Sequence, residues 1–275
     1  MSATKISGTI GFLGFGNMGG AVARGAVAAG ILPSSSILVH DPAFPDSVLS
    51  EQGFARAGSA EDVFRRADVV LLAVKPQVFK EVAGAWTELV SGLSGKTVIS
   101  VMAGIRAGKL REVFPGLTCV RVMPNLGLSV GEGATAIAAD GVAEDSLRLV
   151  ETLFNSCGTT VRVTEDQMDA VTAVSGSGPM YVFEFIEAMT QAGEKAGLSR
   201  QTAYELVRQT IVGSLELLKP VNGVPSASPD EWSTRVRSPG GTTAAAQDLM
   251  RAEDFRGLLE RAVAAAKKRS EELSG

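Results

Sequence analysis

The chain has 275 residues, with 26 Lys and Arg against 30 Asp and Glu, so its formal charge is −4 and it lacks the basic blocks that neutralise nucleic-acid phosphates. Its one histidine, His40, excludes histidine-rich metal sites and nearly every Ser-His-Asp triad. Cys119 and Cys157 are far apart, which excludes a thiolate zinc site. We therefore expect no nucleic-acid partner and no bound metal.

The composition also bears on the membrane and the compartment. The longest aliphatic run, residues 69–74, is far shorter than the roughly 20 residues of a transmembrane helix. The apolar stretch after Lys5 is interrupted by Asn17 and Arg24, which is untypical of a secretory signal. Two isolated cysteines fit a reducing environment. We expect a cytoplasmic protein without a membrane anchor.

From the N-terminus, short apolar runs typical of strands alternate with helical patterns. The strand-like runs cover residues 9–13, 36–40, 68–74, 97–102, 118–123, 134–138 and 159–163. Amphipathic stretches between them cover residues 60–66, 78–93, 107–114 and 144–154. Such alternation produces βαβ units, so residues 1–163 are expected to form an α/β domain with a Rossmann-type, doubly wound parallel sheet.

After Val163 the strand signals stop, and Thr164 with Gln167 has the form of a capping box that opens a helix. We place the domain boundary there, so that residues 164–275 form an all-helical domain. Its expected helices cover residues 167–174, 179–196, 201–218 and 247–273. The Pro-, Gly- and Ser-rich stretch 220–229 is expected to be a mobile loop.

Two apolar stripes run along the expected helices of this second domain. One contains Tyr181, Phe185, Ile186 and Met189, and the other contains Leu206, Ile211, Leu215 and Leu218. They form either the core of the small helical domain or part of an interface between subunits. The sequence leaves both interpretations open.

A glycine-rich turn follows the first expected strand and opens a helix. It reads Gly14-Phe15-Gly16-Asn17-Met18-Gly19 and fits the pattern G-x-G-x-x-G. Gly14 would permit the tight turn, Gly16 would let a pyrophosphate approach the backbone, and Gly19 would let helix and strand pack closely. The helix N-terminus would then offer free N–H groups to the phosphates. We expect this turn to bind a dinucleotide.

Asp41 ends the second expected strand, where a carboxylate accepts hydrogen bonds from the adenosine ribose and repels a 2′-phosphate. No arginine follows directly in Pro42-Ala43-Phe44, so the sequence favours NADH over NADPH, with NADPH still possible. The alternative is that Asp41 only starts a turn before Pro42. His40 is expected to flank the adenosine site rather than to act as a catalyst.

Two later strand ends point to the same crevice, since ligands of doubly wound sheets bind at the carboxyl ends of the strands. Val74, Lys75 and Pro76 follow the third strand, and Ala103 and Gly104 follow the fourth. We expect Lys75 to hold a cofactor hydroxyl or phosphate, and Ala103-Gly104 to lie against the nicotinamide ribose. Each stretch is alternatively ordinary loop structure.

Two further segments place polar groups near a substrate. Asn125, after the fifth strand, offers an amide on the nicotinamide side of the pocket. Ser238-Pro239-Gly240-Gly241-Thr242-Thr243 precedes a strong helix opening, and its glycines and hydroxyls make an anion site suited to a carboxylate. A simple helix cap made by Thr242 or Thr243 is the alternative.

These segments together resemble the Δ1-pyrroline-5-carboxylate reductase family, whose members catalyse the last step of proline biosynthesis. The resemblance is carried by six segments spread in order over nearly the whole chain: Gly11 to Gly19, Ala73 to Gln77, Arg121 to Asn125, Gly131 to Thr135, Ala173 to Pro179 and Ser238 to Thr243. It implies a Rossmann-type domain, a helical dimerisation domain, and reduction of the C=N bond of Δ1-pyrroline-5-carboxylate by NAD(P)H.

The resemblance also implies roles for particular residues. The N–H groups of Gly240, Gly241 and Thr242, with Ser238 nearby, would bind the substrate carboxylate. The hydroxyl of Thr243 would face the ring nitrogen and orient or donate its proton, and positioning suffices where the imine is already protonated. Members of the family usually form dimers with interwoven C-terminal helices, often grouped as five dimers in a decamer.

The chain departs from the family pattern at three places. Leu126-Gly127 stands where Thr-Pro is common, the second strand lacks the Asn-Arg seen in members that prefer NADPH, and the loop at 220–230 is longer than usual. A β-hydroxyacid dehydrogenase is the nearest rival, yet residues 174–189 hold no catalytic lysine. A nucleotide sensor would not need the carboxylate site. Proline feedback and use of six-membered imines are left open.

Overall fold

The computed structural model describes residues 5–221 and 224–274, which fold into two compact units. The first unit consists of Met1–Pro179 together with Ala265–Gly275, and the second is Met180–Ala264. The chain therefore returns to the first unit at its end. The domain boundary expected after Val163 is based on the end of the strand pattern in the sequence. The two units are defined by packing instead, so that boundary stays a prediction.

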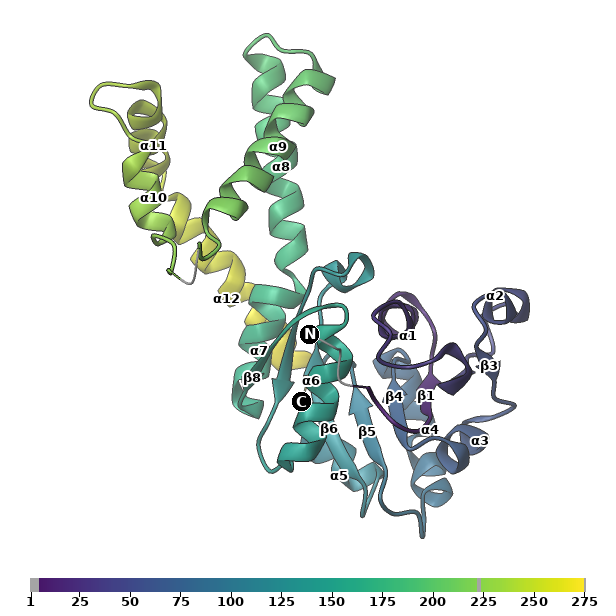
Figure 1. Ribbon diagram of the computed structural model, residues 1–275. Coiled ribbons are helices and arrows are strands. Elements are labelled where there is room, and N and C mark those ends of the chain that lie inside the picture. Colours follow the sequence, from purple (N-terminus) through teal and green to yellow (C-terminus); the bar gives the residue numbers. More distant parts are fainter. Residues whose placement is uncertain (1–4, 222–223, 275) are drawn as a thin grey trace. The chain divides into compact units, whose positions relative to one another are not determined.

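The first unit is built on an eight-stranded sheet (Figure 1). Its strands are β1 (Ile10–Leu13), β2 (Ile37–His40), β3 (Ala55–Arg56), β4 (Val69–Leu72), β5 (Thr97–Ser100), β6 (Thr118–Met123), β7 (Gly133–Ala138) and β8 (Gly158–Val163). Their order is β3-β2-β1-β4-β5-β6-β7-β8, and β1 to β6 are parallel. The expected doubly wound α/β fold is confirmed, with the order reversing between β1 and β4, where such folds bind their ligands.

Strand β7 departs from the expected parallel sheet, because it is antiparallel to β6. The connection between them holds only residues 124–132, including the short helix η2 (Leu126–Val130). A parallel crossover needs about a dozen residues or more, so this connection forces a reversal. Strand β8 is again parallel to β7, since helix α6 (Glu144–Asn155) provides a full crossover.

Helices cover both faces of the sheet. Helices α1 (Asn17–Ala28), α2 (Asp46–Glu51) and α6 pack on one face, and α3 (Ala60–Arg66), α4 (Pro76–Leu89) and α5 (Ala107–Val113) pack on the other. The strands between them carry nearly continuous apolar residues, as expected of strands buried on both faces. Phe12 of β1 lies in the first core and Leu13 in the second. The alternation of side chains along one strand thus fills both layers.

The first unit continues past the sheet through three short helical segments. These are η3 (Glu165–Gln167), α7 (Met168–Val171) and the π-helical segment η4 (Thr172–Gly176). The side chain of Gln167 accepts a hydrogen bond from the N–H of Thr164 at 2.9 Å, which caps the start of this series as the sequence indicated. π-Helical turns often mark functional sites.

The second unit is helical. It contains α8 (Gly178–Lys195), α9 (Arg200–Leu217), α10 (Pro229–Arg235), α11 (Thr242–Ala252) and the first part of α12 (Phe255–Ser274). Helices α8 and α9 form a hairpin (Figure 1), closed by ion pairs from Arg200 to Glu187 and Glu194. The single helix expected over residues 247–273 is wrong, because the chain breaks at Asp254, whose φ is 52°.

The described part of the stretch 220–229, expected to be a loop, contains no helix as far as Ser228. Helix α10 begins at Pro229, and the hydroxyl of Ser228 accepts the N–H of Glu231 at 3.2 Å. The hydroxyl of Ser226 accepts a hydrogen bond from Trp232 Nε1 at 2.9 Å. Residues 222 and 223 of the expected mobile loop lie outside the described residues.

The second unit buries little apolar surface of its own. Among its described residues, the buried apolar side chains are Ala203, Val207 and Ala244. None of the eight residues of the two stripes is buried, and Leu206 and Leu215 are more than half exposed. The stripes therefore do not form a core within one chain, which favours the interface interpretation. Within residues 5–221 and 224–274, every helix is too short or too polar to span a bilayer.

Candidate active site

The glycine-rich turn has the geometry that a dinucleotide requires. Gly14 has φ +88°, and a Cβ there would lie 2.7 Å from the carbonyl carbon of Ala73. A Cβ on Gly19 would lie 2.7 Å from the carbonyl oxygen of Gly14, so helix and strand pack as closely as the motif implies. At Gly16 a Cβ would meet nothing within 4 Å, and the residue is exposed. The backbone at Gly16 is open to a ligand.

Helix α1 begins directly after this open position. Gly16 is its N-cap and provides no side-chain hydrogen bond, so the first-turn N–H groups are available. Asn17 is exposed and Met18 half-buried at the same end. Free N–H groups and the positive end of the helix dipole suit a phosphate. The residues present thus fit the pyrophosphate of a dinucleotide.

Phe15, expected at the cofactor, has its side chain in the core. The ring is 1% exposed and makes edge contacts with Phe12, Phe44 and Phe54. Its backbone N–H donates to Asp41 Oδ2 at 2.7 Å. The Phe15 ring, packed in the core, therefore fixes the shape of the glycine-rich turn.

Asp41 lies at the end of β2 beside the turn and is half-buried. Besides the N–H of Phe15, its carboxylate accepts the N–H of Ala43 at 2.9 Å. Both bonds hold the carboxylate at the edge of the crevice, where the ribose of a dinucleotide lies in this fold. His40 Nδ1 lies 3.3 Å from the carbonyl oxygen of Ala57, so the ring forms a hydrogen bond with the loop that follows β3.

Arg56 is a cation beside this site that the sequence analysis missed. Its guanidinium donates to the carbonyl oxygen of Asp41 at 3.0 Å, donates to the carbonyl of Phe44, and pairs with Asp46. The residue comes from β3, a two-residue strand too short to give a periodic signal. An arginine therefore lies near Asp41, although none follows it directly in the sequence.

The loops after β4 and β5 lie at the same edge of the sheet as the glycine-rich turn, because these strands are parallel to β1. Lys75 is the exposed N-cap of α4, and Pro76 is its first residue. Val74 packs against the second core. Gly104 is buried with φ +73°, next to half-buried Ala103. The structure thus brings the expected cofactor residues to one edge.

Asn125 joins two of the motifs singled out in the sequence. Its Oδ1 accepts the N–H of Ala134 at 3.1 Å, and its Nδ2 donates to the Ser175 hydroxyl at 3.4 Å. Ser175 belongs to η4. The amide is thereby fixed from both sides at the carboxyl end of β6.

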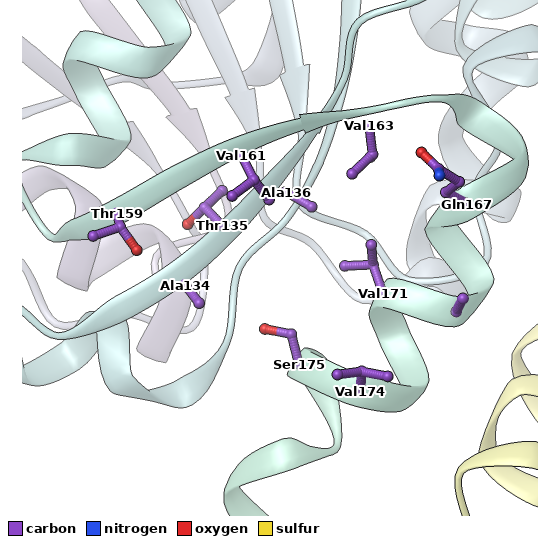
Figure 2. A pocket seen from close by; sticks show the side chains of 11 residues that line it. Ala134, Thr135, Ala136, Thr159, Val161, Val163, Gln167, Val171, Val174 and Ser175 are labelled. Atoms are coloured by element: carbon purple, nitrogen blue, oxygen red, sulfur yellow. The ribbon is translucent and has the colours of Figure 1, made fainter. Parts of the chain in front are cut away.

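An apolar pocket of about 390 Å³ lies next to Ser175, between the β7–β8 pair and the helical segments that follow (Figure 2). Val161 and Val163 line it from β8, and Val171 and Val174 line it from α7 and η4. Val161 and Val174 are 57% and 60% exposed. The pocket offers few polar groups, so it suits apolar side chains rather than a charged substrate.

The segment from Ser238 to Thr243 lies in the second unit. Gly240 has φ +69°, and the N–H of Gly241 donates to the carbonyl oxygen of Ser238 at 3.0 Å. Gly241 is the N-cap of α11 without a side-chain cap, and both Thr242 and Thr243 are exposed. The alternative, a cap on α11 made by the side chain of Thr242 or Thr243, is not present in the structure. The helix end is open to an anion.

The structure places the expected cofactor residues and Asn125 in the first unit and the segment from Ser238 to Thr243 in the second. Among the described residues, no group of three His, Cys, Asp or Glu side chains is placed to hold a metal ion. The doubly wound sheet, the open glycine-rich turn and the helical second unit define the class of dinucleotide-dependent oxidoreductases.

Comparisons with known proteins identify the family within this class. Residues 165–273 match the family model described as pyrroline-5-carboxylate reductase dimerisation, and residues 9–104 match NADP oxidoreductase coenzyme F420-dependent. A pyrroline-5-carboxylate reductase of Arabidopsis thaliana is 40% identical over 269 residues, which cover 96% of this chain and 95% of the relative. The chain belongs to the pyrroline-5-carboxylate reductase family.

Solved structures agree with this assignment. A Plasmodium falciparum pyrroline carboxylate reductase with NADP bound is 32% identical, has a TM-score of 0.86, and is matched over 98% of this chain and 100% of that one. A pyrroline-5-carboxylate reductase from Coxiella burnetii is 31% identical, with a TM-score of 0.89 over the same shares. The resemblance that the motifs indicated is confirmed.

Proposed function

We propose that this chain reduces Δ1-pyrroline-5-carboxylate to L-proline with NAD(P)H, the last step of proline biosynthesis. One observation carries the proposal: proteins named pyrroline-5-carboxylate reductase or pyrroline carboxylate reductase match the chain over nearly its whole length. Gly16 of the first unit has an open backbone and α11 of the second unit has an uncapped start, and these two features match the two anions, pyrophosphate and carboxylate, that the reaction brings together.

The cofactor, when bound, supplies a hydride to the carbon of the substrate C=N bond. Gly14, Gly16, Asn17 and Met18 would hold its pyrophosphate, with Phe15 shaping the turn beneath. After β4, Lys75 would hold a cofactor hydroxyl or phosphate, with Val74 and Pro76 beside it, and after β5 Ala103 and Gly104 would lie against the nicotinamide ribose. These roles follow from the shared edge of the sheet.

For the choice of cofactor, we propose that Asp41 favours NADH. Its carboxylate is fixed by two backbone N–H groups, so a 2′-phosphate would meet a negative charge that cannot turn away. Arg56 is committed to the carbonyl of Asp41 and to Asp46, which limits its availability to a phosphate. NADPH use is expected to be weaker, not absent.

The substrate carboxylate would bind at the start of α11. The N–H groups of Gly240 and Thr242 would donate to it, with the Ser238 hydroxyl as a further donor, and the N–H of Gly241 would be shared between the substrate and the Ser238 carbonyl oxygen, to which it donates at 3.0 Å. Asn125, held by Ala134 and Ser175, would be a further contact to the substrate. Binding by backbone N–H groups requires no charged side chain, in keeping with the absence of one between Ser238 and Thr243.

Thr243 would be the catalytic residue at the ring nitrogen. A threonine hydroxyl is a weak acid, so its contribution is to hold the proton and orient the ring rather than to drive the transfer. A cyclic imine that is already protonated needs no stronger acid. This chemistry accounts for a reductase whose one histidine is occupied elsewhere.

Self-association is part of the proposal. The match of residues 165–273 to a dimerisation family supports it, and so do the exposed stripes on α8 and α9 and the apolar pocket beside β8. We infer a homodimer, with five dimers in a decamer as the larger assembly that the resemblance implies. Two free, buried cysteines fit a reducing compartment, and we assign the protein to the cytoplasm.

The test is the loss of absorbance at 340 nm with purified protein, Δ1-pyrroline-5-carboxylate, and NADH or NADPH in parallel. Consumption of cofactor with proline as product is the expected result, faster with NADH. Cofactor binding without turnover would contradict the proposal and favour a nucleotide sensor. A gel-filtration mass measured with light scattering separates monomer, dimer and decamer.

A further inference from the structure

The end of α12 packs against the loop that follows β5. A Cβ on Gly104 would lie 2.9 Å from the backbone oxygen of Leu273, so the two backbones are in direct contact. Gly104 is buried and has φ +73°, a conformation that a side chain would strain. The loop at the nicotinamide side of the candidate cofactor site therefore has the last turn of α12 as its support.

One buried carboxylate holds that last turn in place. Asp169 of α7 is 6% exposed, and its Oδ1 accepts hydrogen bonds from the hydroxyls of Ser270 at 2.6 Å and Ser274 at 3.3 Å. Ser270 is itself 5% exposed. Hydrogen bonds to a buried charged group are among the stronger ones in proteins. The carboxylate thus fixes α12 over its final turn.

The other oxygen of Asp169 faces the loop. Oδ2 lies 3.6 Å from a guanidinium nitrogen of Arg106, two residues after Gly104. Four residues earlier, Glu165 Oε1 accepts the N–H of Ala107 at 3.2 Å and a hydrogen bond from buried Arg121 at 2.7 Å. Two acidic side chains of the 165–169 segment therefore hold the chain just after the loop.

We propose that Asp169 is a positioning residue for the reductase. It fixes the last turn of α12 against Gly104 and so sets the loop after β5 that borders the cofactor. The proposal rests on the proposed function. It gives the family's dimerisation region, residues 165–273, a second task within the same chain: shaping the nucleotide site. All the contacts involved lie within the first unit.

The test compares Asp169→Asn and Ser270→Ala with wild type in the full-length chain. We expect both to raise the cofactor KM and Kd about tenfold, the effect of losing one hydrogen bond to a charged group. The KM for Δ1-pyrroline-5-carboxylate should change less than about twofold. Ser270→Thr keeps a hydroxyl at this position and should therefore bind the cofactor as tightly as wild type. Arg269→Ala, at an exposed neighbouring position, is the matched control.

A purely structural role predicts a different pattern. If the KM values for cofactor and pyrroline rise together, or if the variants match Arg269→Ala in every constant, the proposal is wrong. Should Asp169→Asn fail to fold, Ser274→Ala, which removes the 3.3 Å bond to Asp169 together with the 2.9 Å bond of the same hydroxyl to the Ser270 carbonyl oxygen, carries the test with a smaller expected rise in cofactor KM. A wild-type protein that binds cofactor but reduces no pyrroline would refute the proposed function, whereas the Kd comparison would still decide the role of Asp169.

Discussion

The carboxylate of Asp41 accepts a hydrogen bond from the backbone N–H of Phe15 at 2.7 Å, which joins the end of β2 to the glycine-rich turn. Asp41→Ser is therefore expected to lower the ratio of kcat/KM for NADH to that for NADPH about three- to tenfold, because the charge facing a 2′-phosphate is lost. Asp41→Asn is the control, since its amide oxygen can still accept the Phe15 N–H. Steady-state kinetics with both cofactors measure this ratio. An unchanged ratio in both variants would contradict the proposal that Asp41 binds the adenosine ribose.

Gly241→Val should damage substrate binding and spare the cofactor. A Cβ at this position would lie 2.2 Å from Ser238 Oγ and 3.2 Å from the Ser238 carbonyl oxygen, so the Ser238 hydroxyl must turn away and the turn before α11 becomes crowded. We expect the KM for Δ1-pyrroline-5-carboxylate to rise more than about tenfold, the usual cost of losing a charge-assisted hydrogen bond. Isothermal titration should give a cofactor Kd within about twofold of wild type. Equal loss of both affinities would count against a carboxylate site at this helix end.

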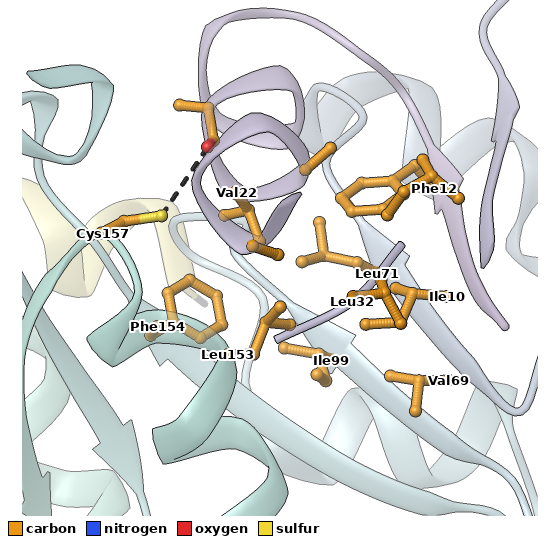
Figure 3. Close-up of a cluster of buried hydrophobic side chains, with 14 of the residues drawn as sticks. Ile10, Phe12, Val22, Leu32, Val69, Leu71, Ile99, Leu153, Phe154 and Cys157 are labelled. Carbon is orange, nitrogen blue, oxygen red and sulfur yellow. Dashed lines mark hydrogen bonds between the residues drawn. The ribbon is translucent and has the colours of Figure 1, made fainter. Parts of the chain in front are cut away.

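Gly25→Ala should destabilise the first unit. A Cβ at Gly25 of α1 would lie 2.0 Å from Cys157 Sγ, and that thiol is 1% exposed among Val22, Leu153 and Phe154 (Figure 3). Overpacking of this kind costs about 1–3 kcal/mol of the free energy of unfolding. The double variant with Cys157→Ala should recover most of it, because the sulfur is gone. Urea unfolding of the four proteins completes the cycle, and additive losses would show that the two sites do not touch.

Arg162→Ala should alter the stability of the protein in acid. Arg162 of β8 donates hydrogen bonds to Glu144 and Glu151 of α6. These bonds, together with the positive charge of Arg162, lower the pKa values of both carboxyl groups. The folded carboxylates then bind fewer protons than the unfolded ones below about pH 4.5, so this stabilisation exists at neutral pH and is lost as the pH falls. Melting temperatures measured from pH 7 to pH 3 should fall less steeply for Arg162→Ala. Parallel curves for the two proteins would contradict this.

The two cysteines should be inert in the folded protein. Burial raises the pKa of the Cys119 thiol to about 11, against a smaller lowering by Arg111, and burial also raises the pKa of Cys157. At pH 8 only about one thousandth of Cys119 is thiolate, the form that reacts. Iodoacetamide should therefore label neither thiol in native protein and both in guanidinium chloride, as counted by mass spectrometry. The stabilisation from the protonated Cys119 thiol is lost as the pH rises through about 11.

The sequence predicted the elements whose pattern is local. All seven expected strands exist; those in the middle of the sheet are apolar runs because they are buried on both faces, whereas the more exposed β8 is marked by its β-branched residues. β3 was missed because Ala55–Arg56 is too short for a pattern. The single expected C-terminal helix was wrong because Asp254, a residue that tolerates positive φ, ends α11 without a glycine or proline to signal it.

The candidate site can be proposed from the sequence where a motif defines it, and not where distant chain segments meet. The turn from Gly14 to Gly19 and the segment from Ser238 to Thr243 have their own sequence signatures. Arg56 reaches Asp41 only through strand pairing, since β3 lies beside β2. Asp169 and Ser270 lie about a hundred positions apart, and no local pattern relates an aspartate in one helix to a serine in another.

The return of α12 to the first unit has a consequence for how the protein is made. Synthesis proceeds from the N-terminus, and domains usually fold as they emerge. Here the first unit stays incomplete after residue 179, because its remaining segment, Ala265–Gly275, is translated only after the whole of the second unit. Until then the carboxylate of Asp169 has no serine to bind and Gly104 has no backbone against it. The candidate nucleotide site therefore reaches its final form only after the second unit, with its exposed apolar stripes, has been synthesised.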